Sequence, residues 1–153
     1  MGMGHVPKDP LHPVGASTEF QGRQRRRVAV GGHHHSRRAV AAQRLARARW
    51  AEQKVAQWYE RNGYEVVARN WTMRGGELDV VARKGSLIVV CEVKARANDN
   101  FGTALEAMTE QKIFRVRRAG FAFLRELSES GLRVRFDVAT MTGVQLEFFH
   151  DAF

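Results

Sequence analysis

The chain of 153 residues is long enough for one domain with its own hydrophobic core. Its single cysteine, Cys91, excludes an internal disulfide, and its position in an apolar run is typical of a small buried hydrophobic residue. The sequence contains neither an apolar run of membrane-spanning length nor a hydrophobic signal-peptide region, so we expect a cytoplasmic protein with no membrane partner.

The formal charge of +9 points to an anionic partner, but this charge is unevenly distributed. Residues 1–50 contain ten Lys or Arg and two acidic residues, giving +8, whereas residues 51–153 contain 15 basic and 14 acidic residues, giving +1. A body so close to neutral does not hold a polyanion through its overall charge. Contacts to a nucleic acid therefore depend on local basic residues or on the N-terminal segment.

Residues 1–36 contain all three prolines, many glycines and no sustained periodicity, which predicts a disordered basic tail. The arginine cluster at 25–27 has two interpretations, a contact to a polyanion or a solvated tail. Three adjacent histidines at 33–35 are weak evidence for a metal site. We therefore expect the folded domain to occupy residues 37–153.

The first half of this domain reads as one helix and three strands. Apolar residues at helical spacing predict a helix over 37–62, and Gly63 is a suitable residue to follow its end. Strands are then expected at the β-branched and apolar runs that follow, separated by glycine-containing turns. These strands cover residues 64–71, 77–83 and 87–94, and the turns cover 74–76 and 84–86.

The second half contains one long helix and two strands. A loop is expected at 97–100 and a short helical segment at 103–108. Thr109 is a good N-cap for a helix over 110–128, and strands follow at 133–140 and 144–150. The order αβββαββ predicts an α/β fold with a mixed central sheet of about five strands flanked by helices.

The strand Leu87–Lys94 carries the most informative residues. It is β-branched and apolar on both faces, which is typical of a buried central strand. Glu92 and Lys94 are two residues apart and therefore point to the same side of the sheet. Placing both in a dry sheet costs several kcal/mol unless they pair or bind a ligand. They are therefore candidate site residues, although such a pair also occurs on solvated strand faces.

Further acidic residues are expected beside this pair. Asp79 lies on the preceding strand with twelve residues between it and Glu92, a separation suited to a hairpin that places the two strands side by side. We expect Asp79 to join Glu92 and Lys94. Glu52 of the first helix either lies above them or is an ordinary surface glutamate. Strand alternation places Glu77, Asp79 and Val81 on one face, so Glu77 is either an auxiliary ligand or a shield at the start of its strand.

This combination of side chains suits phosphodiester hydrolysis. Neighbouring carboxylates repel unless a cation lies between them, and hard oxygen ligands select Mg²⁺ or Mn²⁺. A divalent ion polarises a phosphodiester oxygen and lowers the pKa of a bound water. A nearby lysine positions that water or stabilises the charge that develops in the transition state.

The motif formed by Asp79 and Glu92-Val93-Lys94 resembles that of the PD-(D/E)XK nucleases. A wider set of segments resembles the YraN-like family of small uncharacterised proteins, which is related in fold to the archaeal Holliday-junction resolvases. These segments are Ala51-Glu52, Asn62-Gly63-Tyr64, Ala68–Trp71, Arg74–Ala82, Cys91–Lys94, Phe101-Gly102, Arg135–Val138 and Asp151–Phe153. Two positions differ from the pattern, because Leu78 replaces the proline of the motif and Ala51 replaces the more usual glycine.

The resemblance implies a restriction-endonuclease-like fold and places Glu52, Asp79, Glu92 and Lys94 on active-site positions. The resulting hypothesis is a metal-dependent endonuclease that acts on DNA, including branched DNA. In it, Asp79 and Glu92 bind Mg²⁺ (or Mn²⁺), Lys94 assists the attacking water, and Glu52 orients a metal-bound water. Most members of this family lack an assigned activity. The alternatives are therefore a non-catalytic nucleic-acid-binding module and a protein-interaction adaptor that keeps the fold.

Basic residues near the centre are candidates for phosphate contacts. These are Arg74, Arg96, Lys112 and Arg115. The series Lys112, Arg115 and Arg118 follows one side of a helix, and a solvated helix face explains it equally well. A homodimer is expected only by analogy with nucleases that cut both strands.

Other residues are assigned to packing or to the surface. Asp137 is expected to face outward or to cap a neighbouring segment, because Val134, Phe136 and Val138 occupy the inward positions of its strand. Aromatic residues at the edges of elements are expected in the core, with base stacking as the alternative. These residues are Trp58, Trp71 and Phe114.

Overall fold

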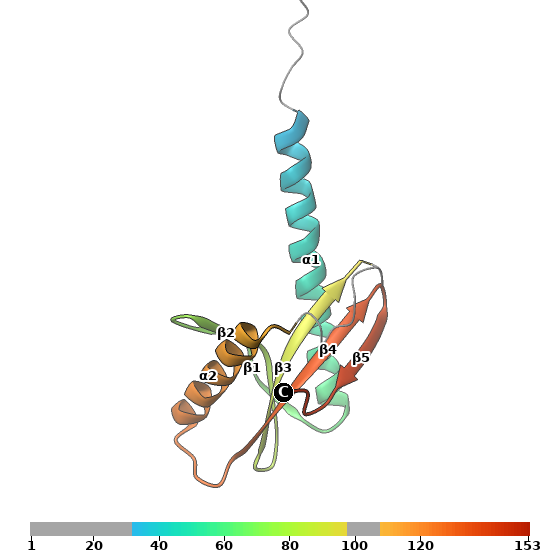
Figure 1. Ribbon diagram of the computed structural model, residues 1–153. Coiled ribbons are helices and arrows are strands. Elements are labelled where there is room, and N and C mark those ends of the chain that lie inside the picture. Colours follow the sequence, from blue (N-terminus) through green and yellow to red (C-terminus); the bar gives the residue numbers. More distant parts are fainter. Residues whose placement is uncertain (1–31, 98–107) are drawn as a thin grey trace, which may run out of the picture.

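The computed structural model describes residues 32–97 and 108–153 and contains two helices and five strands. In chain order these are α1 (Gly32–Arg61), β1 (Glu65–Met73), β2 (Gly76–Lys84), β3 (Leu87–Arg96), α2 (Glu110–Leu127), β4 (Arg133–Thr142) and β5 (Gln145–Phe149). The predicted order αβββαββ is confirmed (Figure 1). The predicted loop 97–100 and short helix 103–108 lie outside the described residues, except at their ends.

The five strands form one mixed sheet in the order β1-β2-β3-β4-β5. Neighbours pair antiparallel except β3 and β4, which are parallel and are connected through α2. The β3–β4 register places Cys91 beside Asp137, and Glu92 beside Val138. The central position of β3 explains its apolar sequence, since strands lie on both of its sides and helices cover both of its faces.

Each face of the sheet packs against one helix. On one face, Val55, Ala56 and Tyr59 of α1 meet alternate residues of the strands, namely Val80, Ala82, Val89, Cys91 and Ala139. On the other face, Val116, Ala119 and Phe123 of α2 meet Leu78, Val81, Ile88, Val90 and Phe136. This two-sided burial makes β3 a rigid support, so the polar residues that it carries are held in fixed positions.

The two helices begin in different ways. In α2, the Thr109 side chain accepts a hydrogen bond from the Lys112 backbone N–H, which confirms the predicted N-cap. The first helix begins at Gly32 instead of the predicted residue 37, and the alanine- and arginine-rich turns from Arg37 onward have high helix propensity without tertiary packing. Its contact with the sheet starts only at the buried Ala51. Figure 1 shows the preceding turns running away from the sheet.

Neither helix in the part of the chain that the structure describes is long and apolar enough to cross a membrane. Two of the three aromatic residues assigned to the core pack there as expected. Trp58 stacks on Phe148 with ring centroids 4.0 Å apart, and Trp71 meets the edge of Phe123 at 5.5 Å. The core assignment was wrong for Phe114, which is 65% exposed on α2.

Candidate active site

The polar centre lies where the pairing of β2 with β3 ends. The antiparallel register runs as far as Val80 opposite Cys91, and Asp79 and Glu92 are the next residues along their strands. Beyond this point the Val93 backbone N–H donates to Asp79 Oδ2 at 2.8 Å. The hairpin thus brings Asp79 beside β3, as its spacing from Glu92 predicted.

The strand alternation predicted for Glu77, Asp79 and Val81 is interrupted. Leu78 packs with the α2 cluster whereas Val80 packs with the α1 cluster, although residues two apart in a regular strand share a face. The irregularity lies opposite Asn70 of β1, which has a left-handed backbone with φ 49° between two regularly paired residues. It places Asp79 between residues supported by both helices.

Glu92 is the most buried acidic group of the centre, with a side chain only 4% exposed. Its Oε1 atom is 2.7 Å from Lys94 Nζ and 2.9 Å from Lys112 Nζ, so two ammonium groups meet one carboxylate oxygen. The other oxygen, Oε2, is buried and has no hydrogen-bond partner among the described residues. Buried carboxylate oxygens are rarely left in this state, so Oε2 is poised to bind a cation or a donor.

Asp79 is partly buried, and its surroundings disfavour its charge. Burial and the negative charge of Glu92 raise its pKa to about 7, with a smaller contribution from Glu52. The hydrogen bond from the Val93 N–H and the positive charge of Lys112 act in the opposite direction. A carboxyl group in such a state readily exchanges its proton for a metal ion.

Glu52 approaches the centre from α1. It follows the fully buried Ala51, and its Oε2 atom accepts a hydrogen bond from Asn70 Nδ2 at 3.0 Å. This bond joins the helix to β1 at the residue with the left-handed backbone. Because the charge of Glu52 also acts on Asp79, the structure brings together all four residues that the resemblance placed on active-site positions.

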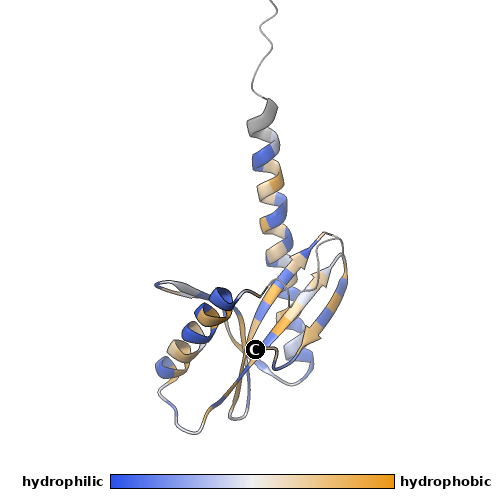
Figure 2. Ribbon diagram, viewed as in Figure 1, coloured by the Kyte–Doolittle hydropathy of each residue, from blue (hydrophilic) through white to orange (hydrophobic). Residues whose placement is uncertain are grey.

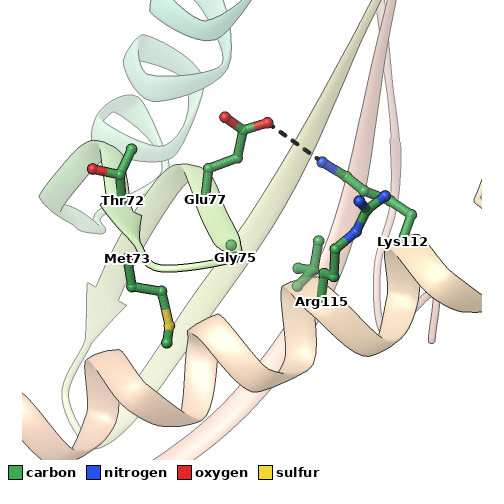
Figure 3. A pocket seen from close by; sticks show the side chains of 8 residues that line it. Thr72, Met73, Gly75, Glu77, Lys112 and Arg115 are labelled. Carbon is green, nitrogen blue, oxygen red and sulfur yellow. Dashed lines mark ion pairs between the residues drawn. The ribbon is translucent and has the colours of Figure 1, made fainter.

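A cavity of about 410 Å³ lies beside the centre, between the β1–β2 turn and α2. Its lining residues are Thr72, Met73, Gly75, Gly76, Glu77, Lys112, Arg115 and Val116. Figure 3 shows Glu77 and Lys112 facing each other across it, with 3.8 Å between Glu77 Oε1 and Lys112 Nζ. The Glu77 side chain is 64% exposed, so it lies at the rim and not in the buried centre.

The four basic residues that were predicted to contact phosphates lie in different surroundings. Lys112 was predicted on a helix surface, but its side chain is only 19% exposed and pairs with Glu92 inside the centre. Arg115 lines the cavity. Arg118 donates to the backbone oxygens of Arg74 and Gly75 at 3.1 and 2.8 Å, so it holds the turn that carries Arg74. The fourth predicted contact, Arg96, is the last residue of β3.

No group of three or more His, Cys, Asp or Glu side chains in residues 32–97 and 108–153 is arranged to hold a metal ion. Mg²⁺ does not require such a cage, since it is usually bound by one or two carboxylates, with water and substrate phosphates completing its shell. The donor set of Asp79 and the unpartnered Glu92 Oε2 fits this pattern. It suits an ion that binds together with a phosphate substrate.

A second polar cluster surrounds Asp137, which was expected either to face outward or to cap a neighbouring segment. The outward orientation was wrong, because α1 covers this face of β4 and leaves Asp137 0% exposed, whereas the cap is confirmed by the hydrogen bond from the Asp151 N–H. Its carboxylate accepts hydrogen bonds from Tyr59 Oη at 2.7 Å, from Arg135 at 2.8 Å and from the Asp151 N–H at 3.0 Å, and His150 Nδ1 lies 2.9 Å away. The sequence signal was the pair Arg135 and Asp137, two residues apart on one strand.

These contacts determine the ionisation of Asp137. Burial acts to raise its pKa, but the hydrogen bonds from Arg135, His150 and the Asp151 N–H hold the pKa below its usual range. The carboxylate is therefore charged and fully paired. The cluster lies on the α1 face and ties the C-terminal residues to β4, so it is a structural element and not part of the centre around Glu92.

Comparisons with known proteins identify relatives that match most of the chain. The model of a family described as "Uncharacterised protein family UPF0102" matches residues 51–141, a range that includes every residue of the polar centre. A UPF0102 protein of Acidothermus cellulolyticus is 38% identical over 129 residues, covering 74% of this chain and 98% of the relative. A UPF0102 protein of Rhodococcus opacus is 40% identical over 117 residues, covering 73% and 99%.

Proposed function

This chain belongs to the uncharacterised protein family UPF0102, the YraN-like family that its motifs resemble, and we propose that it is a metal-dependent endonuclease acting on DNA. The observation that carries the proposal is the state of Glu92. This buried carboxylate is held by two ammonium groups on one oxygen, while its other oxygen is unpartnered, and its negative charge acts on Asp79. In a purely structural salt bridge, a buried carboxylate oxygen that accepts no hydrogen bond would only cost folding free energy.

Asp79 and Glu92 Oε2 are the groups that would hold Mg²⁺, with Mn²⁺ as the second choice. When bound, such an ion supplies charge stabilisation to a phosphodiester and lowers the pKa of a water. The raised pKa of Asp79 supports this assignment, because a cation would offset the repulsion between its carboxylate and that of Glu92.

The remaining residues act on the substrate and the attacking water. Lys94 is 24% exposed and held at 2.7 Å by Glu92, so its ammonium group is fixed where it orients a water and stabilises developing negative charge. Glu52, fixed by Asn70, orients a second water. Lys112 and Arg115 line the cavity, and in this proposal they bind a phosphate adjacent to the one that is cut.

The test is incubation of the full chain with linear, supercoiled and four-way-junction DNA in Mg²⁺, Mn²⁺ or EDTA. We expect metal-dependent cleavage that falls by about 100-fold or more in Glu92→Gln and Lys94→Ala, since each variant removes a group that acts in the transition state. Glu60→Gln, at an exposed position of α1, is the matched control and should cleave normally. Undiminished cleavage by both site variants would refute the assignment.

A second candidate is a nucleic-acid-binding module without hydrolytic activity. It is favoured by the two lysines on Glu92 Oε1, which already neutralise that carboxylate in the absence of a metal. This function predicts salt-sensitive DNA binding, no divalent-metal binding by calorimetry and no nicking of any of the three substrates. Absence of both DNA binding and metal binding would instead favour the protein-interaction adaptor. A homodimer remains a prediction for the endonuclease, to be tested by sedimentation.

A further inference from the structure

The N-terminal half of α1 extends beyond the sheet as an exposed basic helix. We call residues 36–50 the α1 arm. Each of its side chains is exposed, apart from the half-buried Ala48, and Figure 1 shows the arm leaving the globular part of the chain. The arm carries no acidic residue and has arginine at five positions, namely Arg37, Arg38, Arg44, Arg47 and Arg49. A solvated helix this basic fits a polyanionic partner.

The apolar residues of the arm do not form a stripe. Val40, Leu45 and Trp50 are 44%, 54% and 38% exposed, and a rotation of about 100° per residue places them on three different sides of the helix. Figure 2 accordingly shows hydrophilic and hydrophobic residues mixed along the arm. A coiled coil with a second copy or an interfacial membrane helix needs one continuous apolar face. A phosphate backbone does not, which favours a nucleic acid as the partner.

The arm is also continuous with the candidate active site. Glu52 lies on the same helix two residues after Trp50, and through Asn70 it is joined to β1 at the position opposite Asp79. With a rise of about 1.5 Å per residue, Arg49 and Arg44 lie about 4.5 and 12 Å along the helix axis from Glu52. Basic groups at these distances are within reach of phosphates that flank the one at the centre.

The arginines of the arm differ in the side of the helix that they occupy. About 100° per residue places Arg37, Arg38, Arg44 and Arg49 within about 80° of the direction of Glu52, whereas Arg47 lies about 140° away. The family model begins at residue 51, directly after the arm.

We propose that the α1 arm binds the phosphate backbone of a DNA duplex held at the Asp79–Glu92 centre, through the arginines on the Glu52 side of the helix. The inference rests on the proposed function in placing DNA at that centre. It adds a second contact region to a body whose own net charge is close to neutral. Each arginine–phosphate contact releases counterions, so it steepens the salt dependence of binding by about 0.9 in log K against log salt concentration.

The test measures binding of a fluorescent duplex of about 30 base pairs by anisotropy at several salt concentrations in EDTA, with the full chain. We expect Arg44→Gln and Arg49→Gln each to reduce the salt slope by about 0.9, and the double variant by about 1.8. Arg47→Gln removes the same charge at the arginine that lies farthest, about 140°, from the direction of Glu52, and should leave the slope unchanged. Glutamine has a helix propensity close to that of arginine, so circular dichroism should report the same helix content in all variants.

Three results would overturn the proposal. One is an unchanged slope in the double variant, and another is an equal loss of slope in Arg47→Gln, which would mean that the arm acts through charge without a defined face. The third is unchanged duplex binding together with lost binding to phosphatidylglycerol-containing vesicles, which would identify a membrane contact. Cleavage assays separate this test from that of the proposed function. If binding depends on the arm but no DNA is cleaved, the endonuclease proposal is rejected and the proposal for the arm stands. If DNA is cleaved but the salt slopes are unchanged, only the proposal for the arm is rejected.

Discussion

Replacing Asp79 with asparagine should stabilise the folded protein at neutral pH. Asparagine keeps an oxygen that can accept the hydrogen bond from the Val93 N–H, but it removes a charge that burial and Glu92 disfavour. The pKa of Asp79 is raised from 3.8 to about 7, and each unit corresponds to about 1.4 kcal/mol. Asp79→Asn should therefore increase the free energy of unfolding by at most about 4 kcal/mol above pH 7.

The sign of the pH dependence follows from the raised pKa. Between the pKa of the unfolded chain and that of the folded protein, the folded state holds the proton that the unfolded state has lost. The wild type therefore loses stability as the pH rises from about 4 to about 7, and the variant is spared this loss. The advantage of Asp79→Asn should be about 2–3 kcal/mol larger at pH 8 than at pH 5.

Urea denaturation in EDTA at the two pH values measures this difference. Glu77→Gln is the matched control, because it removes a neighbouring carboxylate that is 64% exposed and should change the stability by less than about 0.5 kcal/mol. An advantage of Asp79→Asn that is absent, or equal at both pH values, would refute the argument from burial. Addition of Mg²⁺ should then stabilise the wild type and not the variant, because only the wild type keeps both carboxylates.

Two further predictions concern buried groups outside the centre. Asp137→Ala should destabilise the protein by about 3–5 kcal/mol in urea denaturation, because it leaves the buried Tyr59 hydroxyl and the partly buried Arg135 guanidinium without their partner. A loss below about 1 kcal/mol would contradict this. Since the pKa of Asp137 is lowered on folding, its contribution should be present above the ordinary aspartate pKa and disappear as the pH falls below it. Burial raises the pKa of the Cys91 thiol, so a thiol reagent should label it only under denaturing conditions, and rapid labelling of the folded chain would show that β3 is accessible.

Much of the fold could be read from local sequence patterns. Each strand and helix was predicted to within about two residues, apart from the start of α1, because periodicity, glycine turns and the Thr109 cap act over a few neighbouring residues. The chain separation between Asp79 and Glu92 similarly predicted that their two strands form a hairpin. Local patterns did not predict the break in alternation at Asp79, which lies opposite the left-handed Asn70 of another strand.

The sequence by itself therefore determined the order of elements, the family and the grouping of Asp79, Glu92 and Lys94. Only the tertiary structure decided which residues lie above them. Lys112 was expected on a solvated helix face or at a phosphate, but the orientation of α2 on the sheet makes it a partner of Glu92. Asp137 is fully buried because α1 packs over its face of β4. The physical reason is that periodicity states which side of an element a residue occupies, whereas its burial and charge partners depend on the element packed against that side.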